Sequence, residues 1–201
     1  MSLDKFFSPK SVAIVGASRE KGKVGYEILT NLLRGKYEGE IWPVNPKATQ
    51  IEGLACFPAL EAIGKAPDLV VIVIPAKLVP GVMDECVRVG AKAVVIISAG
   101  FKEVGRDGAE LERHVAQIAK AGGVRIIGPN CLGLIVPASK LNASFGGDLP
   151  AVGSIAFLSQ SGALLAAILD LANASHIGFS KLISIGNKAD LTESDYLEIL
   201  A

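Results

Sequence analysis

The sequence has few of the residues that build disulfide frameworks, metal sites and histidine-based catalysis. Its 201 residues include 3 cysteines and 2 histidines. Cys56, Cys86 and Cys131 are widely spaced, with no CxxC pair and no histidine beside any of them. This pattern argues against a zinc site and a disulfide scaffold. We therefore predict that the chain holds no metal and belongs in a reducing cytoplasm.

The sequence also lacks net charge and long apolar runs. Twenty basic and twenty acidic residues give a formal net charge of zero, which argues against a nucleic-acid partner, because such proteins usually carry an excess of basic residues. No apolar run approaches the ~20 residues that a membrane helix needs, and the N-terminus has no signal-peptide pattern. We expect a soluble protein with no membrane partner, in which any anion site is local.

The residues that are abundant favour an α/β fold. Half of them are apolar, 22 are glycine, and only 5% are aromatic. Short β-branched runs alternate with stretches whose apolar residues recur every three or four positions, as in helices that pack on a sheet. The runs predict parallel strands at 11–15, 41–44, 69–74, 93–97 and 124–127, with helices at 24–34, 79–89 and 108–121. We predict a Rossmann-like, doubly wound parallel sheet over residues 1–137.

A second α/β unit follows after a break in this rhythm. Residues 137–150, PASKLNASFGGDLP, have no apolar period, and we expect a linker over 138–150. A strand at 155–158, a helix at 163–174 and a strand near 182–185 then begin a domain over 151–201. Because the sequence ends inside a predicted helix, we expect this second domain to be truncated.

The first predicted strand runs into a glycine-rich loop that opens a helix. Gly16, Ser18, Lys23 and Gly25 lie in this loop and at the helix start. Free N–H groups and the positive end of the helix dipole favour an anion there, and glycine lets the backbone approach it closely. The spacing matches neither GxGxxG nor GxxxxGK[ST], so an ordinary tight turn stays open as an alternative.

The other predicted strands also end in polar or glycine-rich turns. Asn45 and Lys47 follow the second strand, where an NAD-binding domain usually has an acidic residue for the ribose. A lysine suits a phosphorylated ribose, as in coenzyme A or, less specifically, NADP. Because open α/β sheets bind ligands at the carboxyl ends of their strands, we add the corresponding residues of the remaining turns: Pro75, Ser98, Gly100 and Asn130.

Several segments together resemble a known family. They are SVAIVGAS (11–18), VNPK (44–47), VIPA (73–76), SAGF (98–101) with Glu103, GPNCLG (128–133) and FLSQSGAL (157–164). This set is similar to the nucleoside-diphosphate-forming acyl-CoA synthetases, which include succinyl-CoA synthetase α subunits and archaeal-type ADP-forming acetyl-CoA synthetases. The resemblance implies a CoA-binding domain followed by a flavodoxin-like ligase domain, with coenzyme A or acyl-CoA as the ligand.

The resemblance also implies roles for single residues. Ser18 and Lys23 would hold CoA phosphates, and Lys47 the 3′-phosphate of the adenosine ribose. Pro75 would border the adenine or the pantetheine, and Asn130 would lie near the thiol end. In the family, the turn that contains Ser159, Ser161 and Gly162 faces a phosphorylated histidine, so this turn would bind phosphate; a plain helix cap is the alternative.

That histidine has no counterpart in the sequence. His114 and His176 do not stand in the Ser-His-Thr-Gly type of context that the family uses, so we assign no catalytic residue and expect the phosphohistidine outside this chain. We also expect ADP or ATP and Mg²⁺ to bind only through an ATP-grasp domain or β subunit that this chain lacks. Cys131 is interpreted as a small buried residue. The acidic residues Glu103, Asp190, Glu193 and Asp195 are assigned no chemistry.

Three functions are compatible with this sequence. The first is the CoA-binding part of an enzyme that interconverts acyl-CoA, ADP and phosphate with acid, coenzyme A and ATP. The second is a non-catalytic CoA-binding or regulatory module, such as the synthetase-like region of an acetyltransferase fusion. The third is an NADP-dependent oxidoreductase domain, which the absence of GxGxxG and of residues placed for hydride chemistry opposes.

Overall fold

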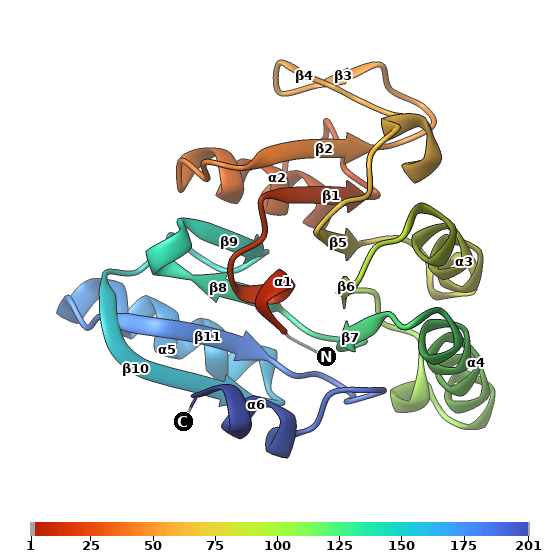
Figure 1. The fold of residues 1–201 in the computed structure, drawn as a ribbon. Helices are drawn as coiled ribbons and strands as arrows, with labels where there is room; N and C mark the ends of the chain where they lie inside the picture. The colour runs from red at the N-terminus through yellow and green to blue at the C-terminus, as the bar shows by residue number, and fades with distance from the viewer. Residues whose placement is uncertain (1–2, 201) are drawn as a thin grey trace.

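A computed structural model describes residues 3–200 and contains two main β-sheets (Figure 1). The first sheet is parallel throughout and has the strand order β2-β1-β5-β6-β7. Every residue of β1, β5 and β6 is buried, because a sheet covered on both faces needs apolar residues on both. The five strands are β1 (Ser11–Val15), β2 (Glu40–Val44), β5 (Leu69–Ile72), β6 (Ala93–Ile96) and β7 (Arg125–Ile127).

The side chains of β1 alternate between the two faces of this sheet. Val12 and Ile14 face a core that they share with helix α2, whereas Ala13 and Val15 face a core that they share with α3 and α4. Helices therefore cover both faces, as the sequence predicted. The helices are α2 (Val24–Arg34), α3 (Val79–Val89) and α4 (Arg106–Gly122), with the short α1 (Asp4–Phe7) before β1.

The second sheet has the order β10-β11-β8-β9 and mixes parallel and antiparallel pairs. Strands β10 and β11 are parallel, whereas β8 runs antiparallel to β11 and β9 antiparallel to β8. Helix α5 packs on this sheet through Leu165, Leu169 and Ala172. The elements are β8 (Gly133–Val136), β9 (Leu141–Ser144), β10 (Val152–Ser159), α5 (Gly162–Ser175), β11 (Phe179–Ser184) and α6 (Glu193–Leu200).

The expected linker at 138–150 contains a buried strand, so the expectation of an irregular segment is wrong for β9. All four residues of β9 are buried, and the strand pairs with β8 in a register that sets Leu134 opposite Ala143. Its polar side chains satisfy one another, since the Ser144 hydroxyl donates to Asn142 Oδ1 (2.6 Å) and Asn142 Nδ2 donates to the Gly147 carbonyl (2.9 Å). These internal hydrogen bonds allow a strand without an apolar pattern to be buried.

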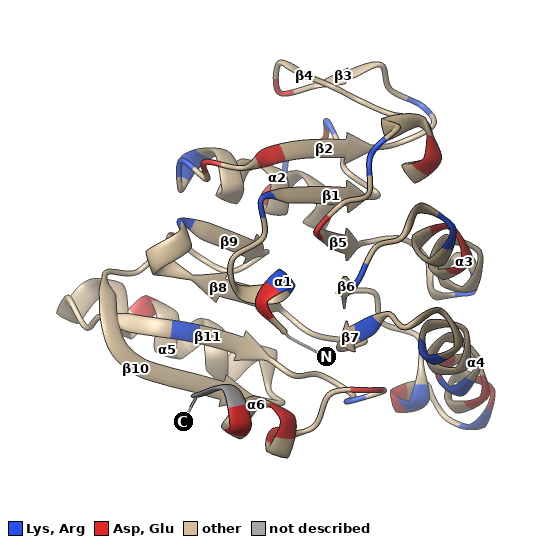
Figure 2. Cartoon of the chain, viewed as in Figure 1, with Lys and Arg blue, Asp and Glu red and all other residues tan. Residues whose placement is uncertain are grey.

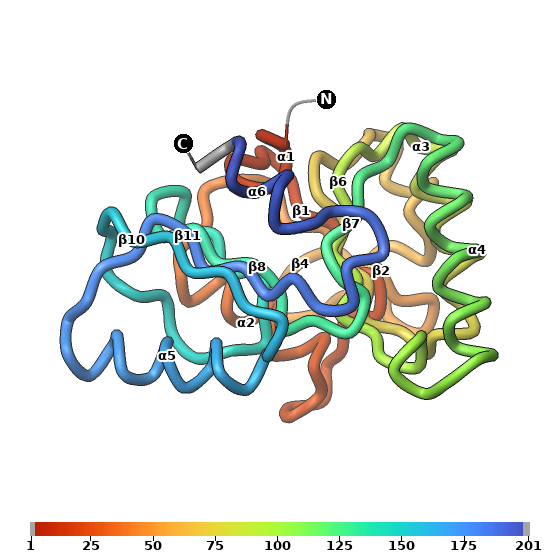
Figure 3. The backbone as a smooth tube through the Cα atoms, turned by 90° about the horizontal axis from the view of Figure 1, so that it is seen from below, coloured from red at the N-terminus to blue at the C-terminus, as the bar shows by residue number. Residues whose placement is uncertain are grey.

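The second sheet thus takes strands from both sides of the expected linker, and the domain boundaries stay a prediction. Charged residues lie mainly on helices and loops, whereas the strands have few of them (Figure 2). Seen from below, α5 and the pair α3 and α4 lie at opposite sides of the molecule (Figure 3). The remaining elements are short: β3 (Gln50–Ile51), β4 (Leu54–Ala55), η1 (Leu60–Ile63), η2 (Ala76–Leu78), η3 (Lys102–Val104) and η4 (Pro137–Ser139).

Candidate functional site

Two adjoining pockets lie beyond the carboxyl ends of the parallel strands. We name them the N-terminal pocket, of about 780 Å³, and the central pocket, of about 800 Å³. They adjoin, because they share the four lining residues Val24, Val73, Ile74 and Pro75. We call the two pockets together the groove. The groove lies where open α/β sheets bind their ligands.

The N-terminal pocket brings together seven of the predicted site residues, namely Gly16, Ser18, Lys23, Gly25, Asn45, Lys47 and Pro75. Its floor depends on two close backbone contacts. Gly16 has φ +95°, and a Cβ atom there would lie 2.1 Å from the Val73 carbonyl oxygen. A Cβ atom on Gly25 would lie 2.1 Å from the Gly16 carbonyl oxygen. Only glycine fits at either position, because the chain passes very close to itself here.

The start of α2 suits an anion. Its N-cap residue, Lys23, makes no side-chain capping hydrogen bond, so the N–H groups of the first helical turn are not capped by a side chain. Lys23, Val24 and Gly25 all line the pocket. Within residues 3–200, neither Lys23 nor Lys47 forms an ion pair, so both ammonium groups are available to a ligand.

Asn45 and Ser18 hold the loops of this pocket in place. Asn45 Nδ2 donates to the Ala17 carbonyl (2.8 Å), and Asn45 Oδ1 accepts from the Lys47 N–H (2.8 Å). Both ends of this amide are therefore used within the protein, which fixes the position of Lys47. The Ser18 hydroxyl oxygen accepts from the Glu20 N–H at 3.0 Å and can still donate its own hydrogen to a ligand.

The central pocket contains Ser98 and Asn130, as well as Pro75. Ser98 is buried, and its hydroxyl accepts from the Ile74 N–H at 3.1 Å, so it fixes the end of the neighbouring strand. Asn130 is exposed, has φ +56°, and donates its N–H to the Ser98 carbonyl (3.0 Å). The structure does not place Gly100 in the lining of either pocket, and the Gly100 N–H donates to the Glu103 carboxylate at 2.5 Å.

The turn before α5 is largely closed by its own serines. The Ser159 hydroxyl accepts from the Ser161 N–H (3.0 Å), and the Ser161 hydroxyl caps the helix by accepting from the Leu164 N–H (3.2 Å). Gly162 lines the central pocket, whereas Ser159 and Ser161 do not. The first N–H groups of the helix, at Gly162 and Ala163, are the donors that these caps leave free.

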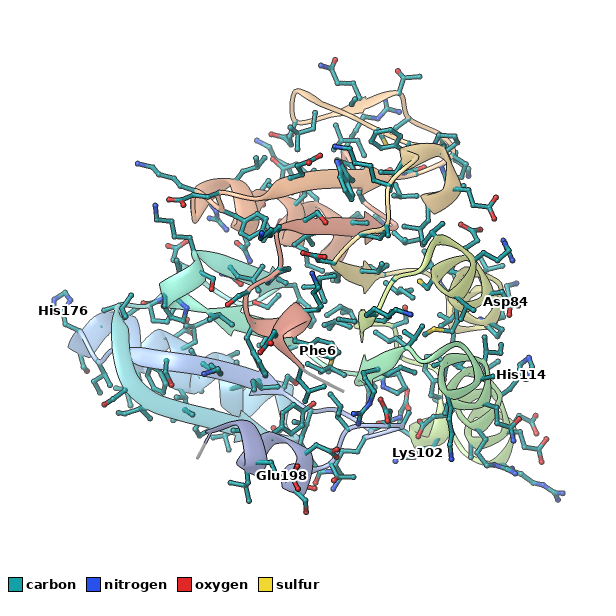
Figure 4. All side chains as sticks on the ribbon, in the orientation of Figure 1. Phe6, Asp84, Lys102, His114, His176 and Glu198 are labelled. Atoms are coloured by element: carbon teal, nitrogen blue, oxygen red, sulfur yellow. The ribbon has the colours of Figure 1, made fainter. Side chains whose placement is uncertain are left out.

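No catalytic role was predicted for Cys131 or for the two histidines. Burial raises the pKa of the Cys131 thiol to about 12, so this thiol stays protonated near neutral pH and packs against the Ile96 carbonyl (Sγ to O 3.3 Å). His114 lies on the outer side of α4 and His176 at the end of α5, both exposed (Figure 4).

Within residues 3–200, no three potential metal ligands gather in a cluster. No helix of this part of the chain is long and apolar enough to cross a membrane.

Sequence reasoning missed a polar network beside the central pocket. Asn187 Nδ2 donates to Glu103 Oε2 (2.7 Å) and to Glu112 Oε2 (2.8 Å), and Lys102 Nζ lies 3.3 Å from Glu112 Oε1. Burial alone would raise the pKa of Glu103, but the hydrogen bonds from Asn187 and from the backbone N–H groups outweigh it and keep that pKa low. Glu103 was assigned no chemistry, yet it joins the two halves of the chain. The sequence signal that could have pointed to this network is Gly186-Asn187, a further polar turn that follows a strand.

Phe145 is a second lining residue that the sequence analysis did not identify. It lines the central pocket. It directly follows β9, within the segment that was expected to be a linker. The sequence offered no periodic pattern that could have placed it there.

These features define a class of protein. An open parallel sheet, a glycine-lined helix start and two unpaired lysines at one end of a long groove are the properties of an α/β domain for a phosphate-bearing nucleotide. The family model described as "CoA binding domain" matches residues 10–137, and the one described as "Succinyl-CoA ligase like flavodoxin domain" matches residues 152–201. The chain belongs to the CoA binding domain family, and the resemblance to the N-terminal region of nucleoside-diphosphate-forming acyl-CoA synthetases is confirmed.

Curated relatives and solved structures agree with this family. The chain is 48% identical to acetate–CoA ligase [ADP-forming] I of Archaeoglobus fulgidus over 99% of its own length and 29% of that protein. It is 44% identical to the α subunit of acetate–CoA ligase [ADP-forming] I of Pyrococcus furiosus, over 98% of this chain and 44% of the subunit. The apo acetyl-coenzyme A synthetase 1 of Ca. Korarchaeum cryptofilum superposes with a TM-score of 0.95 at 40% identity, over 99% of this chain and 43% of that one. The chain thus spans less than half the length of these relatives.

Proposed function

We propose that the chain is the CoA-binding portion of an ADP-forming acyl-CoA synthetase, a ligase that interconverts acyl-CoA, ADP and phosphate with acid, coenzyme A and ATP. One observation carries the proposal: the groove has unpaired lysines and a glycine-lined helix start in one pocket and a mostly apolar lining in the adjoining one. Coenzyme A has the same order of groups, with phosphates at one end and a thiol on a long, mostly uncharged arm.

The residues of the groove divide the ligand between them. The start of α2, with Lys23 and the Ser18 hydroxyl, would bind the diphosphate, and the Lys47 ammonium would bind the 3′-phosphate of the ribose. Pro75 lies in both pockets and would border the adenosine and the start of the pantetheine arm. The thiol end would then lie beside Asn130, where the acyl group is transferred.

The phosphoryl steps require groups outside this chain. His114 and His176 are exposed and lie in neither pocket, so the phosphohistidine would come from another part of the protein. ADP or ATP and Mg²⁺ would bind to an ATP-grasp domain or β subunit. The turn that contains Ser159, Ser161 and Gly162 would bind the phosphate carried by the phosphohistidine through the free N–H groups of Gly162 and Ala163. The name of the Pyrococcus furiosus relative, an α subunit, supports such a partner. Because the named relatives are ligases, we favour this function over a non-catalytic module. The cytoplasmic location predicted from the cysteine pattern is part of the same proposal.

Calorimetric titration of the chain with coenzyme A and dephospho-coenzyme A tests the proposal. Because a hydrogen bond between charged groups contributes about 1.5–3 kcal/mol, we expect coenzyme A to bind about 10- to 100-fold more tightly. Lys47→Ala should remove this difference. Lys92→Ala is the matched control, because Lys92 is an exposed lysine that lines neither pocket. This variant should keep the difference in affinity between the two ligands. Equal affinities for the two ligands in the unmodified chain would contradict the role of Lys47, and absence of coenzyme A binding would contradict the function.

A further inference from the structure

Asn187 lies at the contact between the two halves of the chain. It follows β11, and its N–H donates to the Pro129 carbonyl at 2.8 Å, next to Asn130. The same loop approaches this turn so closely that a Cβ atom on Gly186 would lie 2.3 Å from the Pro129 carbonyl oxygen. The loop therefore holds the Pro129–Asn130 backbone in one place beside the central pocket.

Two carboxylates fix the orientation of the Asn187 side chain. Its Nδ2 donates to Glu103 Oε2 (2.7 Å) and to Glu112 Oε2 (2.8 Å), and both Asn187 and Glu112 are more than nine-tenths buried. An ionised carboxylate only accepts hydrogen bonds, so the NH₂ group of Asn187 must face these two residues. The opposite end of the amide, Oδ1, must then face Asn130.

The orientation of Asn187 sets the orientation of Asn130. Asn130 Nδ2 lies 3.4 Å from Asn187 Oδ1, as a donor facing an acceptor. If the Asn130 amide were turned over, two carbonyl oxygens would face each other without a hydrogen between them. The NH₂ group of Asn130 is thus directed to Asn187, and Asn130 Oδ1 is the end left for a ligand in the central pocket.

We propose that Asn187 is a positioning residue for the ligand. Held by Glu103 and Glu112, it orients the Asn130 amide so that this side chain presents a hydrogen-bond acceptor to the pantetheine end of the ligand. The thiol S–H, the two amide N–H groups and the hydroxyl of pantetheine are the donors that this oxygen can accept from. This inference rests on the proposed function, because it requires coenzyme A in the groove.

A pair of ligands separates this role from an effect on folding. Adenosine 3′,5′-bisphosphate has the adenosine, the 3′-phosphate and the first 5′-phosphate of coenzyme A but no pantetheine arm, so we expect it to reach only the N-terminal pocket. We expect Asn187→Ala to weaken coenzyme A binding about three- to tenfold, as for the loss of one hydrogen bond, and to leave adenosine 3′,5′-bisphosphate binding unchanged. Asn173→Ala removes another amide hydrogen bond, to the Asp148 carbonyl (3.0 Å), and should change neither affinity.

A double-mutant cycle tests whether Asn187 acts through Asn130. In an Asn130→Ala background, Asn187→Ala should cause no further loss of coenzyme A affinity. Glu103→Gln is the second variant, because it weakens the hydrogen bond to Asn187 without removing a side chain. It should weaken the binding of coenzyme A but not of adenosine 3′,5′-bisphosphate. This variant provides the test if Asn187→Ala does not fold.

Several outcomes would overturn the inference. Unchanged coenzyme A affinity in folded Asn187→Ala, equal losses for both ligands, or additive losses in the double variant would each show that Asn187 does not position Asn130 for the ligand. If the unmodified chain binds adenosine 3′,5′-bisphosphate and coenzyme A while Asn187→Ala behaves like it, only the inference fails. If the unmodified chain binds neither ligand, the proposed function fails and the inference with it.

Discussion

At the scale of single residues, the groove depends on places where two backbone segments touch with no side chain between them. Gly25 is such a place, because the first turn of α2 lies directly on the carbonyl of Gly16. Gly16 in turn adopts a left-handed conformation against the Val73 carbonyl. The strand end, the loop and the helix start therefore stay in register only if both positions lack a Cβ atom.

We expect Gly25→Ala to destabilise the fold and to impair ligand binding together. The added Cβ would lie 2.1 Å from the Gly16 oxygen, and relief of such overlap in a packed region typically costs about 1–3 kcal/mol. Because α2 must move away from the loop, coenzyme A affinity should fall as well. Urea unfolding measures the first effect and calorimetry the second.

Gly81→Ala is the matched control for this prediction. Gly81 lies in α3, and a Cβ atom there would meet nothing within 4 Å. Replacing a helical glycine at an open position by alanine usually stabilises by about 0.4–1 kcal/mol. If Gly25→Ala were as stable as Gly81→Ala and bound coenzyme A normally, the close approach would not matter to the groove.

At the scale of elements, α2 is tied to the second sheet as well as to the first. Asn31, on α2, is buried, and its Nδ2 donates to the carbonyl oxygens of Ser144 and Gly146, each at 2.9 Å. These carbonyls lie at and just after the end of β9, an edge strand beside which no further strand among residues 3–200 donates N–H groups to them. One side chain thus satisfies two backbone groups and holds the helix that lines the N-terminal pocket.

We expect Asn31→Ala to lower the free energy of unfolding by about 1–3 kcal/mol, because it leaves these carbonyl oxygens without their partner. Asn173→Ala removes a hydrogen bond to a surface carbonyl instead and should stay within about 0.5 kcal/mol of the unmodified chain. Chemical denaturation of the two variants side by side makes the comparison. Similar stabilities would show that water replaces Asn31 at β9.

The same elements show how far the sequence could predict the fold. The parallel strands and their helices follow from β-branched runs and from apolar residues at helical spacing, because each helix buries one face and the central strands bury two. Strand β8 is also a short apolar run, GLIV, which the sequence analysis left unassigned. Strand β9 does not follow from any such pattern. Asn142 and Ser144 are polar but buried, and their burial is possible only because each finds a hydrogen-bond partner within the folded turn.

The candidate site was predicted to the same extent. Residues at strand ends, such as Lys23, Lys47 and Asn130, could be placed because parallel strands bring their carboxyl ends to one edge. Phe145 could not, since its place depends on an unpredicted strand. Asn187 stands in a polar turn after a strand, but its partners come from contacts across the two halves of the chain, which no local pattern shows. Gly100 has the predicted position in the sequence, but the adjacent Glu103 takes its N–H group.

At the scale of the whole molecule, the two sheets share one core. The largest apolar cluster combines Val12 and Ile14 of β1 with Leu134 of β8, Ala143 of β9 and Ile183 of β11. Phe6 and Phe7 of α1 belong to the same cluster. Neither sheet can therefore keep its apolar face dry when the other unfolds, and we expect the whole chain to unfold as one cooperative unit.

The position of Trp42 permits a direct test of this cooperativity. Trp42 is the only tryptophan of the chain, and it lies in β2, on the face of the first sheet that packs against α3 and α4. Leu169 is fully buried between α5 and the second sheet, so Leu169→Ala should cost about 2–5 kcal/mol. For a domain of this length that loss lowers the melting temperature by roughly 5–15 °C. Because the core is shared, the melting temperature followed by Trp42 fluorescence should fall by the same amount as the melting temperature followed by circular dichroism of the whole chain.

Leu171→Ala is the matched control. Leu171 lies in the same helix but is 56% exposed, so this variant should shift neither melting temperature. A Trp42 transition that stays in place while circular dichroism shows an earlier, separate step would mean that the two sheets unfold independently, and that the loop carrying Asn187 can leave Asn130 without disturbing the pocket that holds the phosphates.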